Sequence, residues 1–112
     1  MEATLEVIGG KWKGLLLHQL IEHDTQRFGE LQSLKPKLSA RILTAQLQEL
    51  EEDGIVVRKA FPVVPPKVEY SLSDYGKTLV PLVRMLQTWG DADQQRRNEK
   101  SLELKLENRE SR

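Results

Sequence analysis

Four side chains on one face of a predicted helix could read the edges of DNA bases. Apolar residues recur at helical spacings over residues 40–53, and Gly54 follows, which predicts a helix that ends there. The apolar residues of this helix that are expected to pack inward are Ile42, Leu43, Leu47 and Leu50. Its polar face carries Arg41, Thr44, Ala45 and Gln48. A guanidinium group can bind guanine, an amide can bind adenine, and a methyl group can contact thymine. The alternative is an ordinary solvated helix face.

The two ends of this helix differ in charge: the chain leading into it is basic, and its C-terminal end is acidic. Residues 27–41 carry a net charge of +3, whereas residues 49–53 carry −4. The cations that produce the positive charge are Arg27, Lys35, Lys37 and Arg41. Ser39 is predicted to cap the helix just before Ala40, so the basic end is also the positive end of the helix dipole. We therefore expect Ser39, Ala40 and the cations Arg27, Lys37 and Arg41 to face DNA.

A second group of cations flanks a predicted hairpin over residues 55–72. Alternating apolar residues predict two strands, and the proline-rich residues 62–66 predict a stiff loop between them. The cations Arg58, Lys59 and Lys67 lie beside this loop, where they could contact phosphate or a minor groove. The alternative is that lysine and proline protect an edge hairpin against aggregation.

Enzymatic and metal-dependent chemistry has little support in the sequence. Cysteine is absent, which excludes disulfides, thiolate metal sites and thiol nucleophiles. His18 and His23 are five residues apart, so they do not share a helix face as a pair of metal ligands would. We therefore predict no catalytic residue, no metal and no cofactor.

The whole-chain composition limits the class of protein further. Lys+Arg and Asp+Glu each total 17, so nucleic-acid binding would have to rest on local clustering of charge. No apolar run is long enough to span a membrane, and no secretion signal opens the chain. These features predict a soluble cytoplasmic protein without a membrane partner.

The elements that must position the candidate residues follow a definite order. Helices are predicted over residues 3–8, 11–23, 29–34 and 40–53, then the hairpin, then a last helix capped by Ser73 and kinked at Pro81. Residues 24–26 are predicted as a polar break, and residues 35–38 as a tight connection because of Pro36. This order indicates an α+β protein with a winged helix-turn-helix, mostly helical, with a two-stranded wing and terminal dimerisation helices.

The terminal helices carry more apolar surface than one small core can absorb. A homodimer would bury it. The predicted interface residues are Leu5, Ile8, Leu79, Leu82, Val83, Leu86 and Trp89. We assign residues 1–90 to the winged helix-turn-helix domain with its terminal helices. Residues 91–112 are assigned to a polar, charged C-terminal extension or tail, in which three alternating leucines leave a strand open as an alternative.

Several stretches resemble HxlR-type winged-helix transcriptional regulators. They are residues 2–13 (EATLEVIGGKWK), 27–31 (RFGEL), 43–54 (LTAQLQELEEDG), 64–72 (VPPKVEYSL) and 89–90 (WG). The resemblance covers residues 2–90 in unbroken order. It implies a bacterial or archaeal homodimeric regulator that binds double-stranded DNA, with the dimer built largely from the terminal helices. A two-fold dimer would in turn require an inverted-repeat operator. The helix over 40–53 would lie in the major groove, and the wing over 55–72 on phosphate or the minor groove.

One departure concerns how such a regulator is switched. Many members of this family carry a Cys-Pro pair just before the opening motif, and some sense electrophiles through that cysteine. This chain has no cysteine, so thiol sensing is not carried over. A small-molecule effector stays open, with Trp12, Phe28, Tyr75 and Trp89 as candidate pocket residues and plain packing as the alternative. Two other functions are alternatives: a protein-interaction module that has lost DNA binding, and a small-molecule-binding protein or enzyme, which the lack of a catalytic cluster disfavours.

Overall fold

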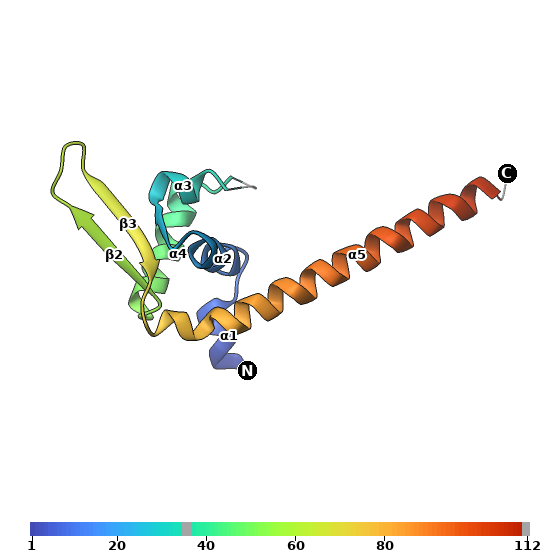
Figure 1. Cartoon of the computed structure of the whole chain (residues 1–112), viewed down its shortest axis with the longest axis horizontal. Helices are drawn as coiled ribbons and strands as arrows, with labels where there is room; N and C mark the ends of the chain where they lie inside the picture. Colours follow the sequence, from blue (N-terminus) through green and yellow to red (C-terminus); the bar gives the residue numbers. More distant parts are fainter. Residues whose placement is uncertain (35–36, 111–112) are drawn as a thin grey trace. The chain divides into compact units, whose positions relative to one another are not determined.

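The computed structural model describes residues 1–34 and 37–110 (Figure 1). Its elements in chain order are α1 (Glu2–Ile8), α2 (Lys13–His23), β1 (Thr25–Arg27), α3 (Phe28–Gln32), α4 (Ala40–Glu52), β2 (Val56–Phe61), β3 (Lys67–Leu72), the 3₁₀ helix η1 (Gly76–Leu79) and α5 (Val80–Glu110). The chain divides into two compact units, Met1–Val80 and Pro81–Arg112. The helix pair α3 and α4, the hairpin of β2 and β3, and the last helix α5 follow one another in the predicted order. The α+β winged helix-turn-helix fold is therefore confirmed. Of the predicted connection over residues 35–38, Lys35 and Pro36 lie outside the described residues.

The sheet has three antiparallel strands in the order β1-β3-β2. The two strands of the predicted wing are both present, and the end of their hairpin stands away from α2, α3 and α4 (Figure 1). The polar break predicted over residues 24–26 is wrong for Thr25 and Gln26, because these residues belong to β1 and pair with Ser71 and Tyr70 of β3. A strand of three polar residues has no apolar period to reveal it. Its partner is distant in sequence, so the pairing depends on the tertiary structure.

Leucines from three helices form the core of the Met1–Val80 unit. Fully buried members are Leu16, Leu17 and Leu20 of α2, Leu31 of α3, Leu38, and Leu43, Leu47 and Leu50 of α4. The inner face of the sheet adds Val56 and Tyr70. Ile42 was expected to pack inward with the other apolar residues of α4, but it is 40% exposed. It precedes Leu43 by one residue, which is about 100° around the helix, so it lies at the edge of the buried stripe.

A hydrogen-bonded junction joins the end of α4 to the chain after the wing. The Ser73 hydroxyl donates to the Gly54 carbonyl oxygen at 2.6 Å, and the Gly76 N–H donates to Ser73 Oγ at 2.8 Å. Ser73 therefore accepts a hydrogen bond from the first residue of η1, whose N-cap residue is Tyr75, and it does not cap the long helix as the sequence had predicted. The predicted kink at Pro81 is also wrong, because α5 begins at Val80 and places Pro81 in its first turn. Proline is tolerated there because the first-turn N–H groups have no helical partner.

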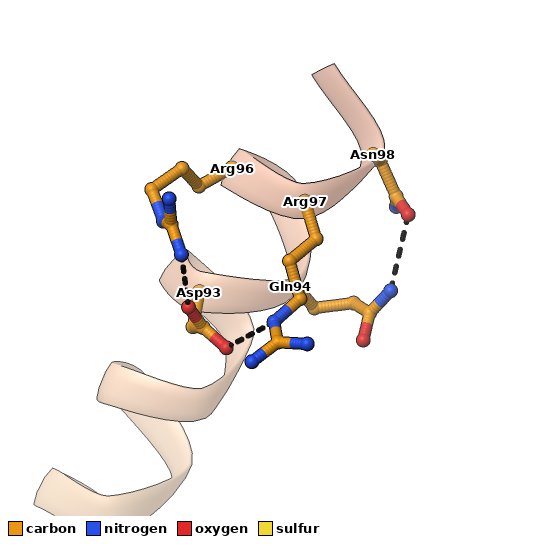
Figure 2. A network of polar contacts seen from close by, with 5 residues as sticks. All are labelled: Asp93, Gln94, Arg96, Arg97 and Asn98. Atoms are coloured by element: carbon orange, nitrogen blue, oxygen red, sulfur yellow. Dashed lines mark hydrogen bonds and ion pairs between the residues drawn. The ribbon is translucent and has the colours of Figure 1, made fainter. Parts of the chain in front are cut away.

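The second unit is the helix α5, which continues through residue 90 without a break to Glu110. Polar side chains one turn apart support it. Arg97 Nε donates to Asp93 Oδ2 at 2.8 Å, and Arg96 and the pair Gln94–Asn98 add further bonds (Figure 2). The hydrogen bond from Arg97, joined by the Arg96 guanidinium, lowers the pKa of the Asp93 carboxyl. Such pairs stabilise an exposed helix by a few tenths of a kcal/mol each. Leu102, Leu104 and Leu106 also lie within α5, so the strand alternative for them is wrong.

Candidate nucleic-acid interface

The start of α4 is fixed by a side-chain cap. Ser39 Oγ accepts the Ile42 N–H at 3.1 Å, so the helix begins at Ala40. A hydroxyl oxygen that accepts this bond can still donate its own hydrogen to a phosphate. In the preceding α3, Glu30 Oε1 accepts the Arg27 backbone N–H at 3.2 Å, which orders the first helix of the pair.

The predicted base-reading face of α4 is exposed. Arg41, Thr44, Ala45 and Gln48 are all exposed, as are Lys37, Ser39 and Ala40 at the N-terminal end. The opposite face of α4 supplies the three buried leucines of the core. Core packing therefore fixes the rotation of α4 about its own axis and leaves the candidate side chains directed outward.

The acidic end of α4 is held by a buried lysine of α2. Lys13 Nζ lies 2.6 Å from Glu49 Oε2, and the Lys13 side chain is only 8% exposed. A buried ammonium group needs such a partner, because leaving it unpaired would be strongly unfavourable. This ion pair joins α2 to α4 and removes Lys13 from the surface that a phosphate could reach.

The sheet register separates the cations of the wing into two sets. Arg27 of β1 and Lys59 of β2 both lie opposite Glu69 of β3, so these three residues form one row on the face directed away from the core. Arg58 lies opposite Tyr70, on the face whose inner part packs on the helices. The three wing cations were predicted as one group, but the two-residue period of a strand directs Arg58 away from Lys59 and Lys67.

Phe61 and Glu69, which were not among the predicted site residues, contact the lysines on the outer face of the sheet. The Lys59 and Lys67 ammonium groups lie 5.0 and 4.9 Å from the centre of the Phe61 ring. Lys67 Nζ also forms an ion pair with Glu69 Oε1 at 2.8 Å. The pairing register of β2 with β3 would have identified Phe61 and Glu69, because it sets Phe61 opposite Lys67 and Glu69 opposite Lys59. We refer to Arg27, Lys59, Phe61, Lys67 and Glu69 as the outer wing cluster.

The predicted dimer residues differ in exposure. Leu5, Leu86 and Trp89 are exposed, with 70% of Trp89 accessible. Ile8, Leu79 and Leu82 are half-buried, and Val83 is buried within a single chain.

A cleft of about 310 Å³ lies in the Met1–Val80 unit between α1, the end of α4 and η1. It is lined in part by Thr4 and Val7 of α1, by Asp53, and by Tyr75. Tyr75 is one of the four aromatic residues proposed from sequence to line an effector pocket, and Trp12 and Phe28 do not line this cleft.

Other kinds of site have no counterpart over residues 1–34 and 37–110. No group of three or more acidic or histidine side chains in these residues could hold a metal ion. In the same part of the chain, no helix is both long and apolar enough to cross a membrane.

Comparisons with known proteins agree on one family. The HxlR-like helix-turn-helix family model matches residues 7–98. YdeP of Bacillus subtilis (strain 168), an uncharacterised HTH-type transcriptional regulator, is 50% identical over 91 residues, which are 81% of this chain and 70% of YdeP.

Solved structures of transcriptional regulators are also similar to this chain. The redox regulator HypR in its reduced form matches with a TM-score of 0.79 and 49% identity, over 83% of this chain and 91% of HypR. The putative HTH-type transcriptional regulator YtcD matches with a TM-score of 0.77 and 49% identity, over 82% of this chain and 93% of that structure. The chain therefore belongs to the HxlR-like helix-turn-helix family, and it is a transcriptional regulator with a DNA-binding fold rather than an enzyme.

Proposed function

We propose that this regulator binds DNA sequence-specifically as a homodimer on an inverted-repeat operator, in the cytoplasm of a prokaryotic cell. In this proposal α4 enters the major groove, and the wing contacts phosphate or the minor groove. The observation that carries the proposal is the exposed face of α4, where side chains able to read bases lie next to the basic, capped N-terminus of the helix.

Each candidate side chain has a role that follows from its chemistry. Arg41 is suited to guanine, Gln48 to adenine, and the methyl groups of Thr44 and Ala45 to thymine. Lys37, Ser39, Ala40 and Arg27 would position the helix through the backbone of the DNA. In the wing, Lys59 and Lys67 would contact phosphate from the outer face, and Arg58 from the other face.

The dimer would cover the apolar side chains that a single chain leaves accessible. Leu5, Leu86 and Trp89 are the exposed members of the predicted interface set, and Ile8, Leu79 and Leu82 are half-buried. Val83 is already buried in one chain, so it would add little new contact. A two-fold axis would present two α4 helices to half-sites about one helical turn apart, roughly 34–36 Å.

The oligomeric state tests the dimer part of the proposal. Sedimentation velocity of the purified chain at micromolar concentration should give a dimer, and replacing the exposed Trp89 with aspartate should shift it toward monomer, because a charge would then be buried at the interface. The matched control is Asp91→Asn, a change elsewhere on the exposed surface of α5. A wild-type monomer that still binds operator DNA tightly would contradict the dimer.

The wing is tested by the salt dependence of binding. Lys67→Ala should weaken binding to operator and unrelated DNA alike, because a phosphate contact carries no sequence information. The magnitude of the slope of log K against log [salt] should fall by roughly 1, since one fewer counterion is released. Fluorescence anisotropy over a salt series measures both quantities. A variant that keeps the wild-type slope would mean that Lys67 stays clear of the DNA.

Treatment with electrophiles tests how the protein is switched. HypR, a relative of about half identity, is a redox regulator, but this 112-residue chain contains no cysteine. Because thiolates are the side chains that such reagents modify most readily, diamide, quinones and aldehydes at modest doses should leave operator affinity unchanged. The measurement is a binding titration before and after treatment, with mass spectrometry of the protein. A reversible loss of binding, with an adduct on lysine or methionine, would contradict this expectation and show that the chain senses electrophiles without a thiol.

A further inference from the structure

A carboxylate lies among the cations of the outer wing cluster. Glu69 belongs to the central strand of the sheet, and the register places it directly between Arg27 on one side and Lys59 on the other. Its Oε1 lies 2.8 Å from Lys67 Nζ, on the same face of the sheet. The Glu69 side chain is 23% exposed and the Lys67 side chain 33% exposed, so both can still be reached from solvent.

The Phe61 ring lies beside the ammonium groups of Lys67 and Lys59. Lys67 Nζ is 4.9 Å from the ring centre, and Lys59 Nζ is 5.0 Å from it. A cation over an aromatic ring is attracted by the negative ring face while its remaining N–H groups stay able to bind an anion. Both ammonium groups are thereby kept on the outer face, and for Lys67 the carboxylate of Glu69 already acts as the anion.

A carboxylate in this position opposes the binding of a phosphate. Both groups are anions that accept hydrogen bonds from an ammonium, so they compete for Lys67. The negative charge of Glu69 also repels a phosphate directly when the two groups are closer together than the Debye screening length.

We propose that Glu69 is an affinity-limiting residue, which holds Lys67 in place and lowers the affinity of the wing for the phosphate backbone of DNA. The inference rests on the proposed function, because it requires the wing to contact DNA. It assigns opposite roles to neighbouring residues: Lys67 strengthens binding to any duplex, and Glu69 weakens it. A limited backbone affinity would keep the complex with DNA reversible.

The test compares Glu69→Gln with wild type by anisotropy on operator and unrelated duplexes over a salt series. The glutamine keeps the shape and the acceptor oxygen but removes the charge. We expect about threefold tighter binding to both duplexes at low salt, the size of one partly screened charge interaction, with the difference vanishing at high salt. Glu69→Asp keeps the charge and should bind as wild type does.

Two further variants make the result specific. Glu6→Gln in α1 causes the same change of net charge outside the wing and should leave binding unchanged. Glu69→Thr also removes the charge with a residue suited to a strand, so it replaces Glu69→Gln if that variant does not fold. If wild type binds DNA and Lys67→Ala weakens it, but both neutral variants of Glu69 bind no more tightly than wild type, the inference is overturned and the proposed function stands. If wild type binds no DNA, both are overturned.

Discussion

Replacing Arg41 with alanine should weaken operator binding by about 1–3 kcal/mol, the discrimination that one bidentate contact with a base provides. The side chain is exposed in the first turn of α4, and the leucines that hold the helix in place lie on the opposite face. Its removal should therefore leave the free energy of unfolding close to that of wild type. A titration with operator DNA measures the loss, and circular dichroism verifies the fold.

A matched arginine separates base reading from general electrostatics. Arg109→Ala changes the net charge equally but lies in the last turn of α5, outside the candidate interface. The Arg41 variant should lose more affinity for operator than for unrelated DNA, whereas the Arg109 variant should lose little for either. A folded Arg41 variant with unchanged operator affinity would exclude this residue from base recognition.

Replacing Gly76 with alanine should lower the free energy of unfolding by about 2–3 kcal/mol, at the upper end of the cost of overpacking a buried site. A Cβ at this position would collide with the Ile55 carbonyl oxygen and would also lie 3.2 Å from Ser73 Oγ. The obstacle is backbone, so it cannot move aside as a flexible side chain would. Relieving the collision would require the backbone to shift at Gly76 or Ile55. That shift would strain the hydrogen bonds through which Ser73 joins Gly54 to Gly76.

Gly14→Ala is the matched control for this prediction. Gly14 lies in α2, and a Cβ there would meet nothing within 4 Å. Alanine should stabilise the helix by about 0.5–1 kcal/mol, because glycine loses more backbone freedom on folding. Urea unfolding measures both changes. A Gly76→Ala protein as stable as wild type would mean that the junction adjusts at little cost.

The helices and the faces of α4 were predictable from the sequence because their signals are local. The buried stripe of Leu43, Leu47 and Leu50 recurs at helical spacing, and Ser39 is a typical capping residue, so the exposed candidate side chains could be selected without a structure. Ile42 was misplaced because a position at the edge of the stripe is buried or exposed according to what packs beside it.

The features that escaped prediction depend on contacts between distant segments. β1 exists because Thr25–Arg27 pairs with β3, and those three residues alone carry no strand period. The pairing of Lys67 with Glu69 and the position of Phe61 between two lysines required the register of β2 on β3. The burial of Lys13 beside Glu49 likewise depends on the packing of α2 against α4, which the local sequence does not encode.

The most direct measurement of the central claim is the sequence of the DNA that the protein selects. Fragments of genomic DNA that remain bound to the purified protein at physiological salt would be isolated and sequenced. A homodimer that reads bases through two α4 helices should enrich an inverted repeat whose half-site centres are about 10–10.5 base pairs apart. Bound fragments that share no sequence would contradict sequence-specific binding, and fragments that carry only a single unrepeated half-site would contradict binding as a homodimer.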